Sequence, residues 1–191
     1  HGAPPIPLVI GGTMFTTGYD IVMAYDIYNG VKYWERMIPG VTRTSLPMGT
    51  SNLVADESGL YVVVDNKQCL RLDGRTGKTL ATYMAPKGDS SHGFWGWIAK
   101  DASSLLGSGS ELDAGRNRAN PKISNSVFAI DSLSGKVKWT HEGGRIEHDG
   151  IAVGGGRLFF VDSKLTDRQA AEGLKNTIRD SSVEDRKPVD R

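Results

Sequence analysis

The chain of 191 residues is 38% hydrophobic, enough to form a buried core, and its 23 basic and 22 acidic side chains almost cancel. This balance excludes a bulk electrostatic attraction to nucleic acid or to an acidic membrane surface. The single cysteine, Cys69, excludes an internal disulfide framework and any metal site built from several cysteines.

Predicted strands follow one another along the chain in groups of four. They are short, rich in β-branched and aromatic residues, and often alternate apolar with polar side chains. The first group covers residues 7–11, 13–18, 21–26 and 31–36, and the second covers residues 52–56, 60–65, 67–72 and 78–83. The third covers residues 94–99, 103–108, 126–131 and 136–141. A fourth group begins with residues 150–156 and 157–163 and then loses the pattern.

The polar segment from Leu165 to Arg191 ends the chain. Its apolar residues Ala170, Leu174 and Ile178 are spaced by four, which predicts a short helix followed by a disordered tail. No apolar run approaches the ~18 residues of a membrane helix, and no signal peptide is visible. Because the sequence begins with His1 rather than Met, we expect a fragment or a processed chain.

The strand groups repeat in register. Three residues of the first group recur in the second at the same distance of 47 (59−12, 73−26 and 77−30), so that Gly12, Asp26 and Gly30 match Gly59, Asp73 and Gly77. Asp131 and Gly135 follow their second-group partners by 58 (131−73 and 135−77), which leaves 11 extra residues (58−47) in the third group. These fall in the polar stretch from Ser108 to Ser124, which predicts an enlarged surface loop.

Each group contains an Asp-x-x-x-Gly element between its third and fourth strands, where an antiparallel sheet needs a tight turn. The Asp side chain can accept hydrogen bonds from backbone N–H groups two residues further on. The Gly can adopt a positive φ where the next strand begins. We therefore predict three equivalent hairpin corners, at Asp26, Asp73 and Asp131.

The corner sequences resemble a known signature. "AYDIYNGVKYW" (residues 24–34) and "AIDSLSGKVKW" (residues 129–139) are similar to the Ala-x-Asp-x-x-x-Gly-x-x-x-Trp motif of the pyrroloquinoline quinone (PQQ)-like, or quinoprotein-like, repeat family. The resemblance covers roughly residues 7–163 and implies that Trp34 and Trp139 dock between neighbouring blades of a β-propeller. The second group has Ala81 at the Trp position, so we expect that docking contact to be missing or supplied by another side chain.

The expected fold class is all-β, a β-propeller fragment of about three and a half four-stranded antiparallel blades. The propeller part spans residues 7–164, with blades at about 7–40, 52–86 and 94–142 and a half blade at 150–163, followed by a helical or disordered tail at 165–191. Family propellers generally close with about six to eight blades, so we expect flanking blades in a longer protein. An open array would leave two blade faces uncovered and favour poor solubility or domain swapping.

Two functions remain open at this point. Some quinone-dependent dehydrogenases of the family grip PQQ between a Trp and a pair of adjacent cysteines and also bind calcium, but Cys69 has no neighbouring cysteine. Trp95 and Trp97 could stack on a flat ligand, although packing in the blade is the favoured interpretation. The other function is a non-catalytic scaffold or protein-interaction propeller, as in family members that help to assemble outer-membrane proteins.

The remaining candidate residues favour structural roles. Glu147, His148 and Asp149 combine carboxylates with an imidazole that could bind a metal or exchange protons, but an inter-blade turn explains them better. His92 and His141 have no partner at a recognisable spacing and are interpreted as structural or exposed. The Gly-rich segment 153–157 lacks the Gly-Lys-Ser/Thr ending of a phosphate loop and predicts a hairpin turn.

We therefore assign no catalytic, cofactor-binding or metal-binding residue, and favour a scaffold that binds a protein partner through the loop Ser108 to Ser124. Two arginines of "GRNRAN" (residues 115–120) in this loop could contact an anionic partner. The alternative is a part of a PQQ- and calcium-dependent dehydrogenase of alcohols or sugars, or an accessory propeller of a larger enzyme. The resemblance implies a location in the periplasm or cell envelope.

Overall fold

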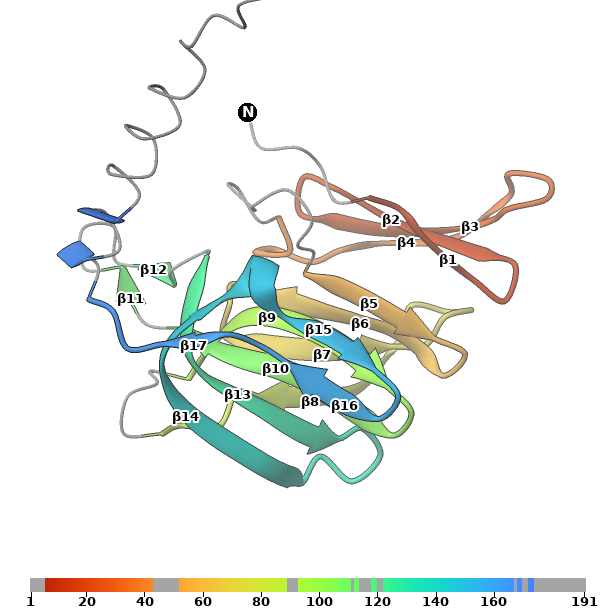
Figure 1. Ribbon diagram of the computed structural model, residues 1–191. Helices are drawn as coiled ribbons and strands as arrows, with labels where there is room; N and C mark the ends of the chain where they lie inside the picture. The colour runs from red at the N-terminus through yellow and green to blue at the C-terminus, as the bar shows by residue number, and fades with distance from the viewer. Residues whose placement is uncertain are drawn as a thin grey trace, which may run out of the picture.

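A computed structural model describes residues 6–42, 52–88, 93–110, 112–113, 118–119, 122–166, 168–169 and 172–173. Three antiparallel sheets dominate these residues and stack side by side along the chain (Figure 1). The predicted all-β fold and the propeller-like arrangement of its sheets are confirmed. In the described part of the chain no helix is both long and apolar enough to cross a membrane.

The first and second sheets follow the predicted four-strand order. The first consists of β1 (Leu8–Ile10), β2 (Thr13–Gly18), β3 (Ile21–Asp26) and β4 (Lys32–Met37). The second consists of β5 (Leu53–Asp56), β6 (Gly59–Val64), β7 (Gln68–Leu72) and β8 (Thr79–Met84). Each strand pairs with the next one along the chain, as in a propeller blade.

The third sheet has five strands rather than four. Its order is β17-β14-β13-β10-β9, built from β9 (Phe94–Asp101), β10 (Ser104–Ser110), β13 (Ile123–Asp131), β14 (Val137–Glu147) and β17 (Asp162–Ser163). The strand predicted at residues 157–163 is therefore divided. Its first part, β16 (Arg157–Phe159), forms a separate hairpin with β15 (Ala152–Gly154), and its last part pairs with β14.

The second sheet is covered on both faces because alternate side chains of β6 enter two different cores. Leu60, Val62 and Val64 pack against the first sheet, where they meet Phe15 and Trp34. Tyr61 and Val63 of the same strand pack against the third sheet. Every residue of β6 is buried, which explains why "GLYVVV" is an uninterrupted apolar run. Stacking of successive blades thus forms the core of the molecule.

The three Asp-to-Gly corners have the predicted conformation. Oδ1 of each Asp accepts the backbone N–H two residues further on, at 2.8 Å for Asp26, 3.1 Å for Asp73 and 3.2 Å for Asp131. The corner glycines have φ angles of 72°, 69° and 72° at positions 30, 77 and 135. Each Gly N–H also donates to the carbonyl oxygen of its Asp. The corners are therefore equivalent turns, as the repeat predicted.

We expect the Asp131 corner to titrate at unusually low pH. Hydrogen bonds from the backbone N–H and then the hydroxyl of Ser134 lower the pKa of Asp131 to about 2. Since this pKa lies below the ordinary value of 3.8, the stabilisation is complete above that value and is lost as pH falls towards 2. Carboxyl NMR titration checks this: Ser134→Ala should raise the pKa, whereas Ser58→Ala, at another turn, should leave it unchanged.

Trp34 docks between blades as the resemblance implied. Its indole Nε1 donates to the carbonyl oxygen of Gly74 at 2.9 Å, and its ring lies against Gly77 of the second corner. The second blade, which has Ala81 at this position, uses a substitute. The hydroxyl of Tyr83, two residues further along β8, donates at 2.6 Å to the carbonyl oxygen of Ser132. This is the equivalent acceptor, because Ser132 follows Asp131 as Gly74 follows Asp73.

The prediction of one surface loop from Ser108 to Ser124 is wrong at both ends. β10 continues to Ser110 and β13 begins at Ile123, so Ser108, Ser110 and Ser124 are buried strand residues. Serine is small enough to fit the blade interior and can satisfy its hydroxyl there, which polar composition alone does not reveal. The insertion itself contains β11 (Leu112–Asp113) paired with β12 (Arg118–Ala119). Ala170, Leu174 and Ile178 of the predicted helix lie outside the described residues.

Candidate functional site

The strongest polar constellation is a buried cluster of three serines and one histidine inside the third blade. Ser124 Oγ lies 2.8 Å from His148 Nε2, 2.8 Å from Ser108 Oγ and 3.1 Å from Ser110 Oγ. Ser108 Oγ is 3.4 Å from the same imidazole nitrogen. We call these four residues the serine–histidine cluster. It joins β10, β13 and the 3₁₀ turn His148–Gly150 (η1) that follows β14.

A β-bulge opens the space for this cluster. The pairing of β9 with β10 shifts between Gly107 and Gly109, so that Ser108 faces two residues of β9. The Ser108 hydroxyl accepts the Trp97 backbone N–H at 2.8 Å and so replaces a hydrogen bond of the ladder. Gly96 lies next to the hydroxyls of the cluster. Any side chain at this position would collide with them, which explains why the residue is a glycine.

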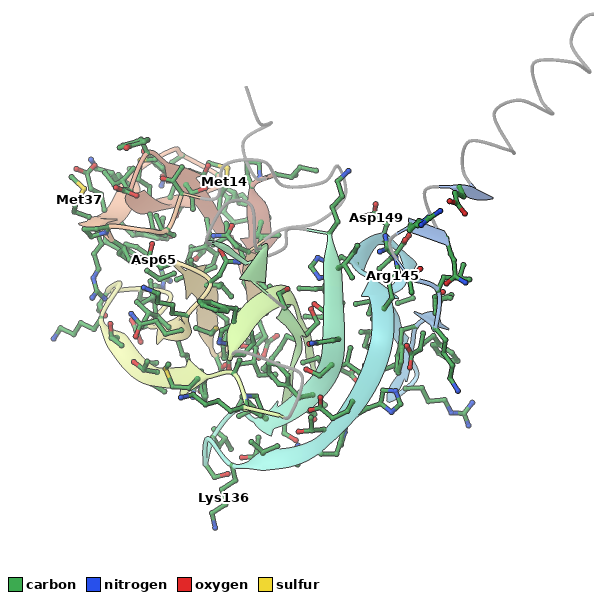
Figure 2. All side chains as sticks on the ribbon, turned by 90° about the vertical axis from the view of Figure 1, so that its left-hand side faces the viewer. Met14, Met37, Asp65, Lys136, Arg145 and Asp149 are labelled. Atoms are coloured by element: carbon green, nitrogen blue, oxygen red, sulfur yellow. The ribbon has the colours of Figure 1, made fainter. Side chains whose placement is uncertain are left out.

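His148 enters the cluster because the chain turns sharply after β14. Its backbone N–H donates to the carbonyl oxygen of Lys122 at 2.9 Å, which ties the turn to the start of β13. Glu147 points elsewhere, with Oε1 3.5 Å from Arg145 Nε, and Asp149 is exposed. Figure 2 shows Arg145 and Asp149 at the end of the blade opposite Lys136. The turn is confirmed, and the three adjacent residues do not converge on one site.

Chemically, the cluster has the contacts of a nucleophile and its base but lacks access. A serine hydroxyl within hydrogen-bond distance of an imidazole is the arrangement used to activate a nucleophile. Here the three serines are at most 1% exposed and His148 is 2% exposed, so no substrate reaches them in this conformation. Each hydroxyl is already bonded within the cluster. The arrangement therefore braces the end of the third blade.

Gly96 provides a test of the brace. A Cβ at this position would lie 2.6 Å from Ser124 Oγ and 2.7 Å from His148 Nε2, besides colliding with Ser110. We expect Gly96→Ala to lower the free energy of unfolding by about 2–3 kcal/mol, since overpacking displaces a hydrogen-bonded interior. Urea denaturation measures this loss. Gly154→Ala is the control, because a Cβ there meets nothing within 4 Å. Equal losses in both variants would contradict the brace.

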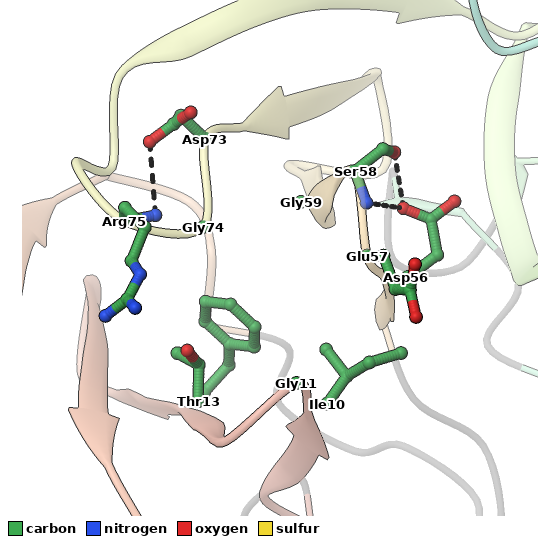
Figure 3. A pocket seen from close by; sticks show the side chains of 11 residues that line it. Ile10, Gly11, Thr13, Asp56, Glu57, Ser58, Gly59, Asp73, Gly74 and Arg75 are labelled. Atoms are coloured by element: carbon green, nitrogen blue, oxygen red, sulfur yellow. Dashed lines mark hydrogen bonds between the residues drawn. The ribbon is translucent and has the colours of Figure 1, made fainter.

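A pocket of about 250 Å³ lies between the first and second blades (Figure 3). The turns 56–59 and 73–75 line one side of it, and Ile10, Thr13 and Phe15 line the other. Two of its three carboxylates are engaged in the turns: Asp56 Oδ1 accepts the Ser58 N–H at 2.8 Å, and Asp73 Oδ1 accepts the Arg75 N–H at 3.1 Å. Asp56 also pairs with Lys100 Nζ at 2.9 Å. The pocket is therefore a gap at the interface between the two blades.

Comparison with known proteins identifies the architecture. No family model and no curated protein matches the sequence. Quinohemoprotein alcohol dehydrogenase from Comamonas testosteroni superposes with a TM-score of 0.53 and 17% identity, over 74% of this chain and 21% of that chain. BamB from Moraxella catarrhalis superposes with a TM-score of 0.50 and 17% identity, over 80% of this chain and 43% of that chain. A europium-containing methanol dehydrogenase superposes with a TM-score of 0.50 and 20% identity, over 72% of this chain and 24% of that chain. The chain has the fold of a partial quinoprotein-like β-propeller.

This propeller segment spans less than half of each of these structures. Two of the three residues considered for a quinone clamp are buried in this structure. Trp95 is 0% exposed and packs edge-on against Phe128 with ring centroids 5.0 Å apart, so neither indole face can receive a flat ligand. Cys69 is buried in the core between blades, where burial raises the pKa of its thiol. Trp97, the other candidate, is partly exposed.

The other residues that the sequence offered as candidates for a functional site are the histidines and the Gly-rich segment. His141 lies 3.4 Å from Asp162 Oδ2 and against Phe160, whereas His92 lies outside the described residues. The Gly-rich segment 153–157 forms the β15–β16 turn, with positive φ at Gly155 and Gly156, as predicted. Sequence reasoning missed the serine–histidine cluster, because its hydrogen-bonded pairs are 14 to 40 residues apart and no local pattern brings them together.

Proposed function

We propose that this propeller segment is a non-catalytic scaffold that binds protein partners in the periplasm or cell envelope. One observation supports the proposal more than any other: the constellation most like a catalytic site, Ser124 with His148, is sealed inside a blade and bonded within itself. A buried polar network that is fully satisfied makes a blade rigid rather than reactive. Rigid blades with variable loops are well suited to present a binding surface.

The insertion between β10 and β13 is the proposed partner surface. Its described part is the two-stranded hairpin of β11 and β12, which lies beside the third sheet (Figure 1). Replacing residues 111–121 with a short Gly-Ser turn should preserve the fold while abolishing capture of an envelope protein by cross-linking. Retention of the same cross-linked partner by the shortened chain would contradict this assignment.

The second candidate is a segment of a PQQ- and calcium-dependent dehydrogenase, favoured by the structural likeness to two alcohol dehydrogenases. Reconstitution of the purified chain with PQQ and Ca²⁺, followed by quinone absorbance and dye-linked oxidation of ethanol and glucose, separates the candidates. A scaffold gives the absorbance of free PQQ and no dye reduction. Stoichiometric quinone binding or substrate-dependent dye reduction would overturn the scaffold proposal.

A further inference from the structure

A lysine side chain is inserted into the interface between the second and third blades. The side chain of Lys100, on β9, is 5% exposed, and its Nζ lies 2.9 Å from Oδ2 of Asp56 and 5.7 Å from the centre of the Tyr61 ring. The same ammonium donates to the carbonyl oxygen of Ala102 in the β9–β10 turn. A carboxylate, a carbonyl oxygen and an aromatic ring therefore hold one ammonium between these two blades.

The positions around this lysine recur in the first blade, because every blade joins its first two strands by a two-residue turn. Ile10, Asp56 and Asp101 are the last paired residues before these turns, so they are equivalent. Phe15 and Tyr61 are equivalent as well, since they follow Ile10 and Asp56 by the same five residues (15−10 and 61−56). The carboxylate and the ring that hold the ammonium thus have apolar equivalents one interface earlier.

The lysine itself is replaced by an alanine at that earlier interface. Ala55 on β5 is the equivalent of Lys100 on β9, because each directly precedes the residue that closes its turn. Ala55 packs against the core between the first two blades, and the pocket of about 250 Å³ at this interface is lined by Ile10 and Phe15. The pocket therefore corresponds to the space that a lysine side chain fills in the next interface.

The rim of this pocket is acidic. Its described lining residues include three carboxylates, those of Asp56, Glu57 and Asp73, but one guanidinium, that of Arg75. Figure 3 shows Arg75 and the turn that holds Glu57 on different sides of the pocket. Glu57 is exposed, and within the described part of the chain its carboxylate has no hydrogen-bond or ion-pair partner. It takes the place of Ala102, so its carbonyl oxygen is the equivalent acceptor for an ammonium.

We propose that this pocket binds a lysine side chain of a protein partner. The methylene stem packs on Ile10 and Phe15, and the ammonium is held by the carbonyl oxygen and the carboxylate of Glu57. A cation on an apolar stem fits this pocket because its inner wall is apolar and its rim carries more negative than positive charge. The inference rests on the proposed scaffold role and specifies the chemistry of one contact with the partner.

The test titrates Nα-acetyl-lysine N-methylamide into the isotopically labelled 191-residue chain and follows the backbone amide signals by NMR. We expect saturable shifts of the Gly59 and Gly74 amides, which line the pocket, with a dissociation constant in the millimolar range. The norleucine analogue has a similar apolar stem without the ammonium. It should bind at least ~10-fold more weakly, as expected for the loss of a charged hydrogen-bond donor.

Two substitutions test the pocket from opposite directions. Ala55→Lys should place the chain's own ammonium in the pocket and abolish the shifts. Glu57→Gln should weaken binding about 5-fold, the effect of one partly exposed ion pair. Glu147→Gln is the matched control, because it removes an exposed carboxylate from the third blade, and it should bind like the unmodified chain. If Ala55→Lys does not fold, Glu57→Gln and the norleucine comparison decide the question.

Three results would overturn the proposal. These are no saturable shift up to the solubility limit of the probe, equal affinity for the lysine and norleucine probes, or binding that Glu57→Gln and a folded Ala55→Lys both leave unchanged. Partner capture through residues 111–121 and the quinone assays test the scaffold role separately. A failure of the lysine experiment is therefore distinguishable from a failure of that role.

Discussion

Trp34→Ala should lower the free energy of unfolding by about 4 kcal/mol, the loss expected for removing a large aromatic side chain from a packed core. The indole closes the interface between the first two blades, where it contacts Phe15 with ring centroids 6.3 Å apart and donates to the Gly74 carbonyl at 2.9 Å. Its removal leaves a cavity and an acceptor without its donor. Guanidinium denaturation followed by circular dichroism measures the effect.

The matched control is Trp139→Ala, which deletes the same side chain from the same position of the repeat. Because Trp139 is 41% exposed and its receptor corner is absent from the described residues, we expect a change below about 1 kcal/mol. Comparable losses in the two variants would show that Trp139 is buried in solution. Such a result would contradict the exposure of Trp139 in this structure.

Gly77→Ala should cost about 3 kcal/mol, from two sources that add. The residue has a φ of 69°, a left-handed conformation that costs an L-residue roughly 1–2 kcal/mol. The new Cβ would also lie 2.7 Å from the ring of Trp34, and such overpacking typically costs a further ~1–3 kcal/mol. Urea denaturation measures the sum.

Gly135→Ala separates these two sources. Its φ of 72° imposes the same backbone strain, but a Cβ there meets nothing within 4 Å. The expected loss is therefore about 1 kcal/mol, from the backbone alone. If both substitutions cost the same, the corner glycine would serve only as a turn and not as the receptor for the docking tryptophan.

The regular part of the fold was predictable from local sequence. A strand alternates at period two, and an Asp-x-x-x-Gly turn bonds to its own backbone, so both are encoded within a few residues. The spacing of Asp26, Asp73 and Asp131 thus located three corners, and the resemblance carried by Trp34 identified the docking interface. Ala81 even signalled where a substitute contact was needed, although not that Tyr83 would supply it.

Tertiary structure decided the features that depend on residues far apart in the sequence. The serine–histidine cluster forms only when a bulge at Ser108, a strand beginning at Ile123 and the turn at His148 meet in space. The pairing of Asp162–Ser163 with β14 likewise joins segments distant in the sequence and is not set by strand propensity. The sequence by itself determined which strands and turns form. Burial is a property of the assembled blades, so only their packing decided which side chains are buried and which, like Trp139, are exposed.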